Sequence, residues 1–503
     1  MDKFDVVIIG SGMGGLVCGN LLALEGYKVC LIEKNKQIGG SLQTYVRDKV
    51  IFDSGVHYLG GLSKGQNLYQ IFQYLGIIPH LKLQQLDPDV FDRVYMGDDE
   101  TGYDYAQGYE NFIARLLEHF PDEEAALITY CDKIKEICSK FPLYNLLPGD
   151  ENNAKASVLE IDTKGFIDSI TENEKLREVL AGNNALYAGE AGKTPLYVHA
   201  LIVNSYIESS WKCIDGGSQI AKFIGRNILH MGGTILRKTS AVNIVEENGI
   251  VTHVEVNDGR KIYADHFISN IHPVQTLEIT QTDLIKKAYR NRLKSIQNTI
   301  SSFTINIVFK KNTFPYFKHN YYCCKEGSVW TTADYNEDNW PLGYAVFVGA
   351  SSRSPEFAEG MSILSYMKYE EVSEWADSFN TVLDEEDRGT AYNEFKKRKA
   401  ERLLDEVEKR FPGLRSKIRS YYTATPLSYR DYIGNSDGSL YGISKDYRDP
   451  LKTFISPRTK LRNLYFTGQN LNLHGILGSA MSAIVTTNAL LGHDHIIEKI
   501  RNA

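Results

Sequence analysis

The sequence predicts an α/β fold in which a sheet of mainly parallel strands is interrupted by a second part of mixed α+β character. Three stretches predict the sheet, because residues 3–40, 211–270 and 463–480 each combine short apolar strands with glycine turns and helices. Residues 84–209 and 276–450 between them follow other patterns. The sheet is therefore expected to be assembled from separated pieces of the chain.

The first stretch begins with an apolar run at residues 5–9, which is typical of a buried parallel strand. Gly10, Gly12 and Gly15 follow it in a GxGxxG pattern. The first glycine permits a tight turn, the second lets the backbone approach a pyrophosphate, and the third lets the next helix pack closely on the strand. These residues predict a Rossmann-type dinucleotide site.

The elements that follow agree with this prediction. A helix at about 14–25 directs its N-terminal amides and its dipole towards the phosphates. A second strand at 28–32 ends at Glu33, where an acid accepts the adenosine ribose hydroxyls. An acid at this position disfavours a 2′-phosphate and leaves FAD or NAD. Gly39 and Gly40, followed by Thr44, resemble the extended fingerprint of FAD enzymes of the amine oxidase and phytoene desaturase type, which favours FAD.

Length and composition limit the remaining alternatives. A chain of 503 residues can bury a large core and is expected to form two or more domains. The net charge of -7 gives no reason to expect nucleic acid as a partner. The 7 cysteines are scattered without metal-ligand spacing, which predicts a reducing compartment and no metal site. With no signal peptide evident, a cytoplasmic location is expected, with association at the inner membrane surface as a variant.

Residues 84–209 read as a different domain. Alternating apolar and polar positions at 84–108 suggest strands, and 109–141 carry apolar residues at helical spacing. The apolar, aromatic stretch at 186–207 fits either a plain core helix or a helix along an apolar pocket, and a core helix is favoured.

Residues 211–270 return to the first pattern, with a helix opened by residues 214–217, several strands and a hairpin turn at 257–259. The predicted domains are accordingly discontinuous. Residues 1–83, 210–275 and 451–503 form the predicted FAD-binding domain, and residues 84–209 and 276–450 form the predicted substrate-binding domain.

Within 276–450, the alternation at residues 302–309 predicts a half-buried strand. The cluster at 314–318 mixes aromatic residues with a lysine, which fits either an ordinary turn, the favoured reading, or peripheral contact with a membrane. Residues 395–411 form a predicted amphipathic helix with a solvated charged face.

The last informative stretch, residues 463–480, has a short strand, glycines, polar residues and then a helix. In such a geometry, backbone amides and a helix N-terminus approach an anionic or electron-rich group. In a flavoprotein this group is the pyrimidine edge of the isoalloxazine. The stretch from Gly475 to Gly478 is therefore predicted to lie against the flavin.

Four blocks together resemble the carotenoid oxidoreductase family of phytoene desaturases and isomerases, and most of all its retinol saturase branch. They are the GSGMGG turn with Glu33, and residues 52–61, 425–442 and 464–480, which span nearly the whole chain. The chain departs from the family pattern at Ser41, where arginine is frequent, at Asp215, where proline is frequent before the glycine pair, and at His474, where many members have proline.

The resemblance implies a glutathione reductase-like FAD-binding domain with an inserted α+β substrate domain. It also implies an FAD-dependent oxidoreductase that moves hydride between the flavin and a C=C or C–C bond of a retinoid or carotenoid-like polyene. A saturase that reduces a conjugated C=C is the favoured direction, and NAD(P)H is considered as an external electron donor. Two alternatives stay open, a flavin amine oxidase and a non-catalytic prenyl-binding chaperone of the GDP dissociation inhibitor type. The oligomeric state is left open.

No pattern in the sequence identifies a general acid or base. His57 and His474 are the titratable candidates for catalysis near the flavin. The predicted cofactor-binding residues are Gly10, Gly12, Met13, Gly14, Gly15, Glu33, Lys34, Gly39, Gly40, Ser41, Val242, Gly468, Gln469, Gly475, Ile476 and Leu477.

Overall fold

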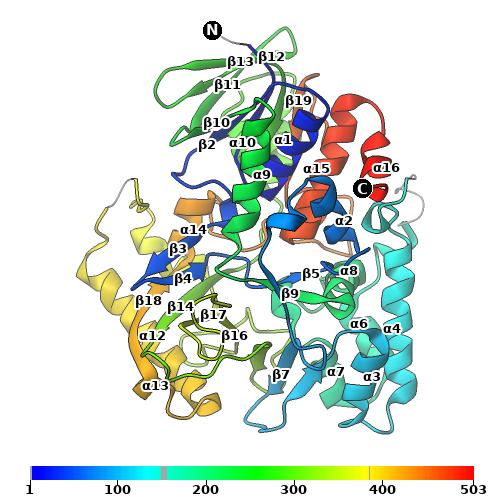
Figure 1. Ribbon diagram of the computed structural model, residues 1–503, viewed down its shortest axis with the longest axis vertical. Helices are drawn as coiled ribbons and strands as arrows, with labels where there is room; N and C mark the ends of the chain where they lie inside the picture. The colour runs from blue at the N-terminus through cyan, green and yellow to red at the C-terminus, as the bar shows by residue number, and fades with distance from the viewer. Residues whose placement is uncertain (1–2, 149–155, 384–385) are drawn as a thin grey trace.

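Two large sheets lie towards opposite ends of the computed structural model, which describes residues 3–148, 156–383 and 386–503 (Figure 1). The first sheet has the order β10-β2-β1-β13-β12-β11, and β19 pairs with β13 outside this path. Its parallel strands are β1 (Phe4–Ile9), β2 (Val29–Glu33), β10 (Thr234–Arg237), β13 (Lys261–Ser269) and β19 (Leu464–Phe466). The α/β class is thus confirmed, and distant stretches supply neighbouring strands.

An antiparallel extension continues the first sheet through β11 (Ala241–Glu247) and β12 (Ile250–Val256). The predicted turn at 257–259 joins β12 to β13, so the hairpin is confirmed. Because the parallel strands share one direction, their carboxyl ends meet at one edge, where Gly10, Glu33 and Asn270 follow or end their strands.

Three helices pack beside this sheet: α1 (Met13–Leu24), α9 (Ser218–His230) and α15 (Gly475–Leu491). α1 contacts both of the others and is almost wholly buried. The roles of its glycines are steric, since a Cβ on Gly15 would lie 2.1 Å from the Gly10 carbonyl oxygen and one on Gly19 2.9 Å from the Leu31 side chain. Shorter helices nearby are α2 (Asn67–Tyr74), α10 (Pro273–Glu278), α11 (Lys287–Lys294) and α16 (His495–Arg501).

The second sheet has the order β18-β14-β17-β16-β15-β7-β8. Its strands are β7 (Asp92–Met96), β8 (Tyr103–Tyr105), β14 (Ser301–Phe309), β15 (Asn320–Cys324), β16 (Gly343–Val348), β17 (Gly360–Met367) and β18 (Ile418–Ala424). The prediction that residues 302–309 are half-buried is wrong, because every residue of β14 is buried. β14 lies between β17 and β18, and its outer face is covered as well, for example by Tyr45 on Asn306 and Tyr429 on Thr304.

Helices lie on two sides of the second sheet. The prediction of helices at 109–141 is confirmed by α3 (Tyr109–Leu117) and α4 (Glu124–Ser139), which are joined by α6 (Thr163–Ile170), α7 (Glu174–Leu180) and α8 (Leu196–Glu208). On the other side lie α12 (Gly389–Arg410), α13 (Leu414–Lys417) and α14 (Pro426–Ile433). α12 buries Leu403, Leu404 and Val407 along one face, as its amphipathic pattern predicts.

Two small sheets lie outside the large ones. β5 (Leu59–Gly60) and β6 (Leu83–Gln85) both pair with β9 (Ser210–Cys213), and β3 (Thr44–Arg47) pairs with β4 (Val50–Asp53). These strands lie between the two large sheets in Figure 1. The chain passes through this region between β2 and β7 and again between α8 and β10, and the domain boundaries predicted at residues 83 and 210 fall within it.

In the aromatic cluster at 314–318, Phe314 points inward, whereas Pro315 and Lys318 are exposed. Phe314 is buried and stacks on Phe309 with ring centroids 4.5 Å apart. Within the three described ranges of the chain, no helix combines the length and apolar character needed to cross a bilayer.

Candidate functional site

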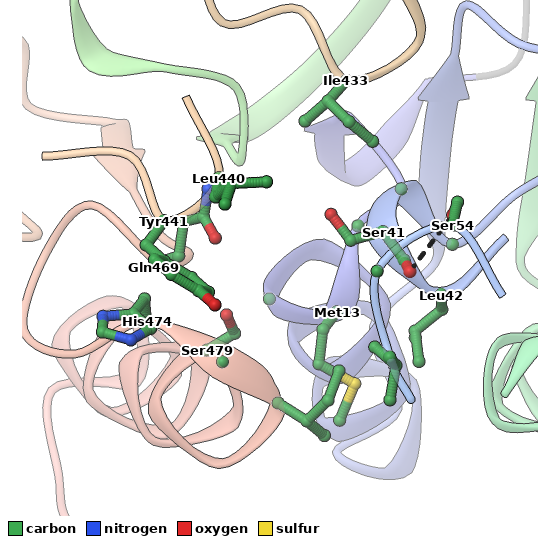
Figure 2. A pocket seen from close by; sticks show the side chains of 18 of the residues that line it. Met13, Ser41, Leu42, Ser54, Ile433, Leu440, Tyr441, Gln469, His474 and Ser479 are labelled. Carbon is green, nitrogen blue, oxygen red and sulfur yellow. Dashed lines mark hydrogen bonds between the residues drawn. The ribbon is translucent and has the colours of Figure 1, made fainter. Parts of the chain in front are cut away.

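A cavity of about 560 Å³ extends from the carboxyl edge of the first sheet to the second sheet. At one end it is lined by the residues of the GxGxxG turn and by Glu33, and at the other by residues of α8, β15, β16 and β17. Figure 2 shows Met13, Ser41 and Leu42 on one side, facing Gln469, His474 and Ser479 on the other. The two terminal regions of the chain thus form opposite walls of one site.

Backbone atoms form the wall at the glycine turn. Gly10, at φ +90°, has a conformation that side-chain-bearing residues rarely adopt. A Cβ on Gly14 would lie 2.8 Å from the Cα of Gly468, so no larger residue fits between these two segments. The first amides of α1 have no intrahelical acceptor and face this end of the cavity. Gly10, Gly12, Met13 and Gly14 line it, whereas Gly15 and Gly468 pack behind the lining.

Glu33 is buried at the end of β2, and its carboxylate is oriented by the backbone. Oε2 accepts a hydrogen bond from the Ser11 amide at 3.1 Å, and Oε1 accepts one from the Asn35 amide at 2.7 Å. Oε2 also accepts from the Ser11 hydroxyl, so both of its lone pairs are used, whereas Oε1 keeps one lone pair for a ligand in the cavity.

The second glycine turn lies beside the first. The Gly39 amide donates to the Ser11 carbonyl oxygen at 3.0 Å, and both Gly39 and Gly40 have positive φ. Ser41 follows and accepts a hydrogen bond from the Ser54 hydroxyl through its carbonyl oxygen at 3.3 Å (Figure 2). Gly39, Gly40, Ser41 and Lys34 all line the cavity.

Two of the predicted cofactor-binding residues, Lys34 and Val242, differ in their position relative to the cavity. Lys34 donates from Nζ to the Asp431 carbonyl oxygen at 2.8 Å, and burial lowers its pKa. Val242 does not line the cavity, and its side chain is half exposed on β11. Its neighbour Ala241 does line the cavity, so Val242 lies next to the site rather than in its wall.

The opposite wall is formed by the segment that leads into α15. Gln469, His474, Gly475, Ile476 and Leu477 all line the cavity. Gly475 is the first residue of α15, at φ +76°, and a Cβ placed there would meet no protein atom within 4 Å. A side chain at this position would therefore occupy the cavity itself.

His474 is held in one tautomer. Its Nε2 lies 3.1 Å from the Leu186 carbonyl oxygen, which can only accept, so Nε2 carries the proton and Nδ1 is the free acceptor. Its ring packs on Tyr441 at 4.5 Å. Burial lowers the pKa of His474 to about 4, so the imidazole is neutral at pH 7.

His57 lies at the other end of the same cavity. Its ring stacks on Phe347 with centroids 4.3 Å apart. Burial, together with the charge of Lys212, lowers the pKa of His57 to about 4, which also makes it neutral at pH 7. The two predicted catalytic histidines therefore share one cavity but come from different walls.

Sequence reasoning missed most of the end formed by the second sheet. Its lining is mostly aliphatic and aromatic, and no charged side chain is among these residues: Tyr58, Leu201, Ile202, Ser205, Tyr206, Tyr322, Ala345, Phe347 and Leu364. Tyr58 lies within residues 52–61, one of the four blocks that carry the family resemblance, whereas no sequence pattern marked Tyr322. α8 is largely buried, as a core helix should be, yet it also lines the cavity, so the alternative reading of residues 186–207 was equally right.

Asn270 is a further residue that the sequence did not single out. It follows β13, lines the cavity, and approaches both Gly12 and Gly14 so closely that a Cβ on either would lie within 3 Å of its side chain. Its position at a strand end, beside the glycine turn, was the available signal. Among the residues that the structure describes, no group of three or more His, Cys, Asp or Glu side chains is placed to hold a metal ion.

Comparison with known proteins agrees with this geometry. A family model described as an NAD(P)-binding Rossmann-like domain matches residues 8–75. An all-trans-retinol 13,14-reductase from Danio rerio is 26% identical over 99% of this chain and 87% of its own length. A chloroplastic prolycopene isomerase from Daucus carota is 24% identical over 96% of this chain and 79% of its own length.

Solved structures show the same fold. A cyclohexylamine oxidase from Brevibacterium oxydans superposes with a TM-score of 0.61 at 12% identity, covering 98% of this chain and 99% of that one. At this identity the likeness concerns the fold alone. The Rossmann dinucleotide-binding domain and the oxidoreductase class predicted from the sequence are confirmed. Over nearly its whole length, the chain is a relative of the all-trans-retinol 13,14-reductases and prolycopene isomerases, the group that its sequence resembles.

Proposed function

We propose that the protein is an FAD-dependent oxidoreductase that transfers hydride between the flavin and a C=C or C–C bond of a retinoid or carotenoid-like polyene. The observation that carries the proposal is one continuous cavity. It joins the end lined by the GxGxxG turn and Glu33, the dinucleotide end, to an apolar end. A cofactor bound at the end formed by the glycine turn and an apolar substrate bound beyond it would meet inside one cavity.

The residues present fit FAD. The pyrophosphate is assigned to the glycine turn and the N-terminus of α1, where a Cβ on Gly12 or Gly14 would collide with its neighbours. Oε1 of Glu33 supplies an acceptor for an adenosine ribose hydroxyl, and Gly475 leaves room for a planar ring near the N-terminus of α15. When bound, the flavin supplies two-electron hydride chemistry. The predicted cofactor-binding residues that line the cavity are assigned as its contacts, whereas Val242 lies next to the site and Gly15 and Gly468 pack behind its lining.

The substrate end fits an apolar chain. Residues of α8, β15, β16 and β17 bury carbon surface there, and the charged residues that line the cavity lie at the dinucleotide end. Burial of a polyene at about 25 cal/mol per Å² of apolar area supplies most of its binding free energy. Phe347, Leu201 and Leu364 exclude water from the reacting carbons.

The two neutral histidines are assigned to the site as polar groups that hold a proton. His474 presents an unprotonated Nδ1, since Nε2–H is used by Leu186. His57 stacks on Phe347 at the substrate end. Saturation of a conjugated C=C remains the proposed direction, with NAD(P)H as the candidate external donor.

An anaerobic experiment tests this function. The flavin of the purified protein is reduced before retinol or phytoene is added, and a simple amine is added separately to the oxidised protein. We expect reoxidation of the flavin together with loss of polyene absorbance for a polyene and no reaction with the amine. Reduction of the bound flavin by NADPH is measured in parallel.

The outcomes separate the alternatives. Protein that binds no FAD at any concentration would refute the flavin assignment and favour a chaperone of the prenyl-binding type. Oxidised flavin that bleaches with the amine, but reduced flavin that is inert to every polyene, would indicate an amine oxidase.

A further inference from the structure

Three buried side chains form a hydrogen-bonded chain that leads away from the substrate end of the cavity. The Tyr58 hydroxyl donates to Asp92 Oδ2 at 2.8 Å and lies 2.8 Å from the Tyr322 hydroxyl. Tyr58 and Tyr322 line the cavity, whereas Asp92, on β7, is fully buried behind them. The hydrogen bonds therefore run from Tyr322 through Tyr58 to Asp92, with both tyrosines at the cavity.

Asp92 is fixed by two further donors. Asn320 Nδ2 lies 2.9 Å from Oδ1, and Asn183 Nδ2 lies 3.3 Å from Oδ2. Asn320 is directly opposite Asp92 in the pairing of β15 with β7, so the sheet itself sets this contact. With three donors around it, the carboxyl group cannot rotate away from Tyr58.

The direction of the hydrogen bonds follows from counting protons. A tyrosine hydroxyl has one proton, so when Asp92 is ionised Tyr58 donates to it and Tyr322 must donate to Tyr58. When Asp92 is protonated, each bond can reverse, and Tyr322 then directs its proton towards the cavity. The chain therefore has an accepting state and a donating state.

We propose that Asp92, Tyr58 and Tyr322 form a proton relay for the reaction in the cavity, with Tyr322 as the catalytic residue that exchanges a proton with the polyene. Tyr58 and Asp92 act through it, as positioning and proton-storing residues. The inference rests on the proposed function, because it concerns the second hydrogen of the same reaction.

The step balances in both directions. In reduction, a hydride supplied by a two-electron reduced flavin forms one C–H bond, and the π pair of the C=C bond moves to the neighbouring carbon. That carbon takes the proton of Tyr322, which is replaced from Tyr58 and in turn from Asp92, leaving a carboxylate that solvent reprotonates between turnovers. In desaturation, the same carbon would lose its proton to Tyr322, and the electron pair left behind would form the C=C bond as a hydride leaves the neighbouring carbon for an oxidised flavin. Asp92 would end protonated.

Electrostatics allow Asp92 to occupy both states near neutral pH. Burial raises the pKa of Asp92 to about 6, although its hydrogen bonds and the charge of Lys212 oppose the rise. Lys212, on β9, is itself fully buried, and burial lowers its pKa to about 7. The titratable groups that face Asp92 from the surrounding elements are Tyr58, Tyr105 on β8, Tyr206 on α8, Lys212 and Tyr322.

The relay gives the two directions opposite pH dependence. Reduction of a polyene needs the protonated state, so its rate should fall as the pH rises through the pKa of the relay. Desaturation needs the ionised state, so its rate should rise over the same range. If the three residues had a purely structural role, replacing them would leave the pH dependence of both rates as it is in the wild-type protein.

Three variants test the relay in the FAD-loaded protein. Asp92→Asn, Tyr58→Phe and Tyr322→Phe should lower kcat roughly 10²- to 10⁴-fold, the usual contribution of general acid–base catalysis, with a small change in KM. Asp92→Asn should also abolish the pH dependence. The matched control is Tyr321→Phe, which changes the neighbouring tyrosine of β15. The Tyr321 ring packs on Phe411 with centroids 4.9 Å apart, outside the cavity, so this variant should keep the wild-type profile.

A readout without turnover complements the kinetics. Infrared difference spectra of wild-type protein across neutral pH should show a buried carboxylic acid that titrates and is absent in Asp92→Asn. Wild-type protein that fails with every polyene would refute the proposed function while leaving this signal in place. Wild-type protein that turns over a polyene, with Tyr322→Phe equally fast and its pH profile intact, would overturn the relay.

Discussion

The two ends of the cavity differ in what forms their walls, which is backbone at one end and side chains at the other. At the dinucleotide end the walls are backbone, with glycines at positive φ, helix N-termini and one carboxylate oriented by amides. At the substrate end they are side chains from α8, β15, β16 and β17. A backbone site tolerates almost no added atoms but depends little on residue identity elsewhere, whereas a side-chain site can be reshaped one residue at a time.

The largest effect is expected from Gly14→Val. A Cβ there would lie 2.6 Å from Asn270 Oδ1 and 2.8 Å from Gly468 Cα, and the branched side chain would enter the phosphate cradle. FAD binding, measured by titration of the apoprotein, should be lost. Gly349→Ala is the control, since a Cβ there meets nothing within 4 Å. Wild-type affinity in a folded Gly14→Val protein would contradict the assignment of the backbone end.

Glu33→Ala should have the next largest effect. Hydrogen bonds to charged groups contribute about 1.5 to 3 kcal/mol, so FAD affinity should fall roughly 10- to 150-fold while the fold is kept. Glu326→Ala, which removes an exposed carboxylate, serves as the control for charge. Equal affinity of the two variants would show that Glu33 does not bind the ribose.

Ile202→Trp tests the side-chain end alone. Ile202 lines the cavity from α8, and a larger ring would take up space meant for the polyene. We expect KM for the polyene to rise by roughly one order of magnitude, with FAD affinity unchanged, because overpacking costs about 1 to 3 kcal/mol. A parallel loss of FAD affinity would mean that the two ends are not separable.

The smallest effect concerns pH. His199, on α8, is fully buried between the hydroxyls of Tyr130 and Tyr187, each 2.7 Å away, and burial lowers its pKa from 6.5 to about 3. Between pH 6.5 and about pH 3, His199 is protonated in the unfolded chain but neutral in the native protein, so the unfolded chain binds one more proton. The stability that depends on the neutral imidazole is therefore complete above pH 6.5 and is lost as the pH falls. The free energy of unfolding should drop by about 1.4 kcal/mol per pH unit from this group.

Urea unfolding of wild type and His199→Gln at several pH values between the two pKa values measures this slope. Gln keeps hydrogen-bonding atoms but cannot titrate, so its slope should be shallower by that amount. An unchanged slope would show that the imidazole is not held neutral in the native protein.

The sequence alone determined the dinucleotide end, because its parts are local. A strand, a glycine turn and a helix start within the same few residues, so the spacing of Gly10, Gly12 and Gly15 already fixes where the backbone can approach a ligand. The structure added the position of Asn270, the packing of Gly15 and Gly468 behind the lining, and the placement of Ala241 rather than Val242 in the wall.

The substrate end was decided by tertiary structure. Tyr58 and Tyr322 are 264 residues apart in the chain, and Asp92 meets them only because β7 pairs with β15. The burial of β14 on both faces likewise depends on Tyr45 and Tyr429. The alternation of apolar and polar residues within β14 carries no information about these distant side chains. Periodicity reports which face of an element is apolar, but which distant side chains share a cavity depends on how the sheets and helices pack, and that information is not local to any stretch of sequence.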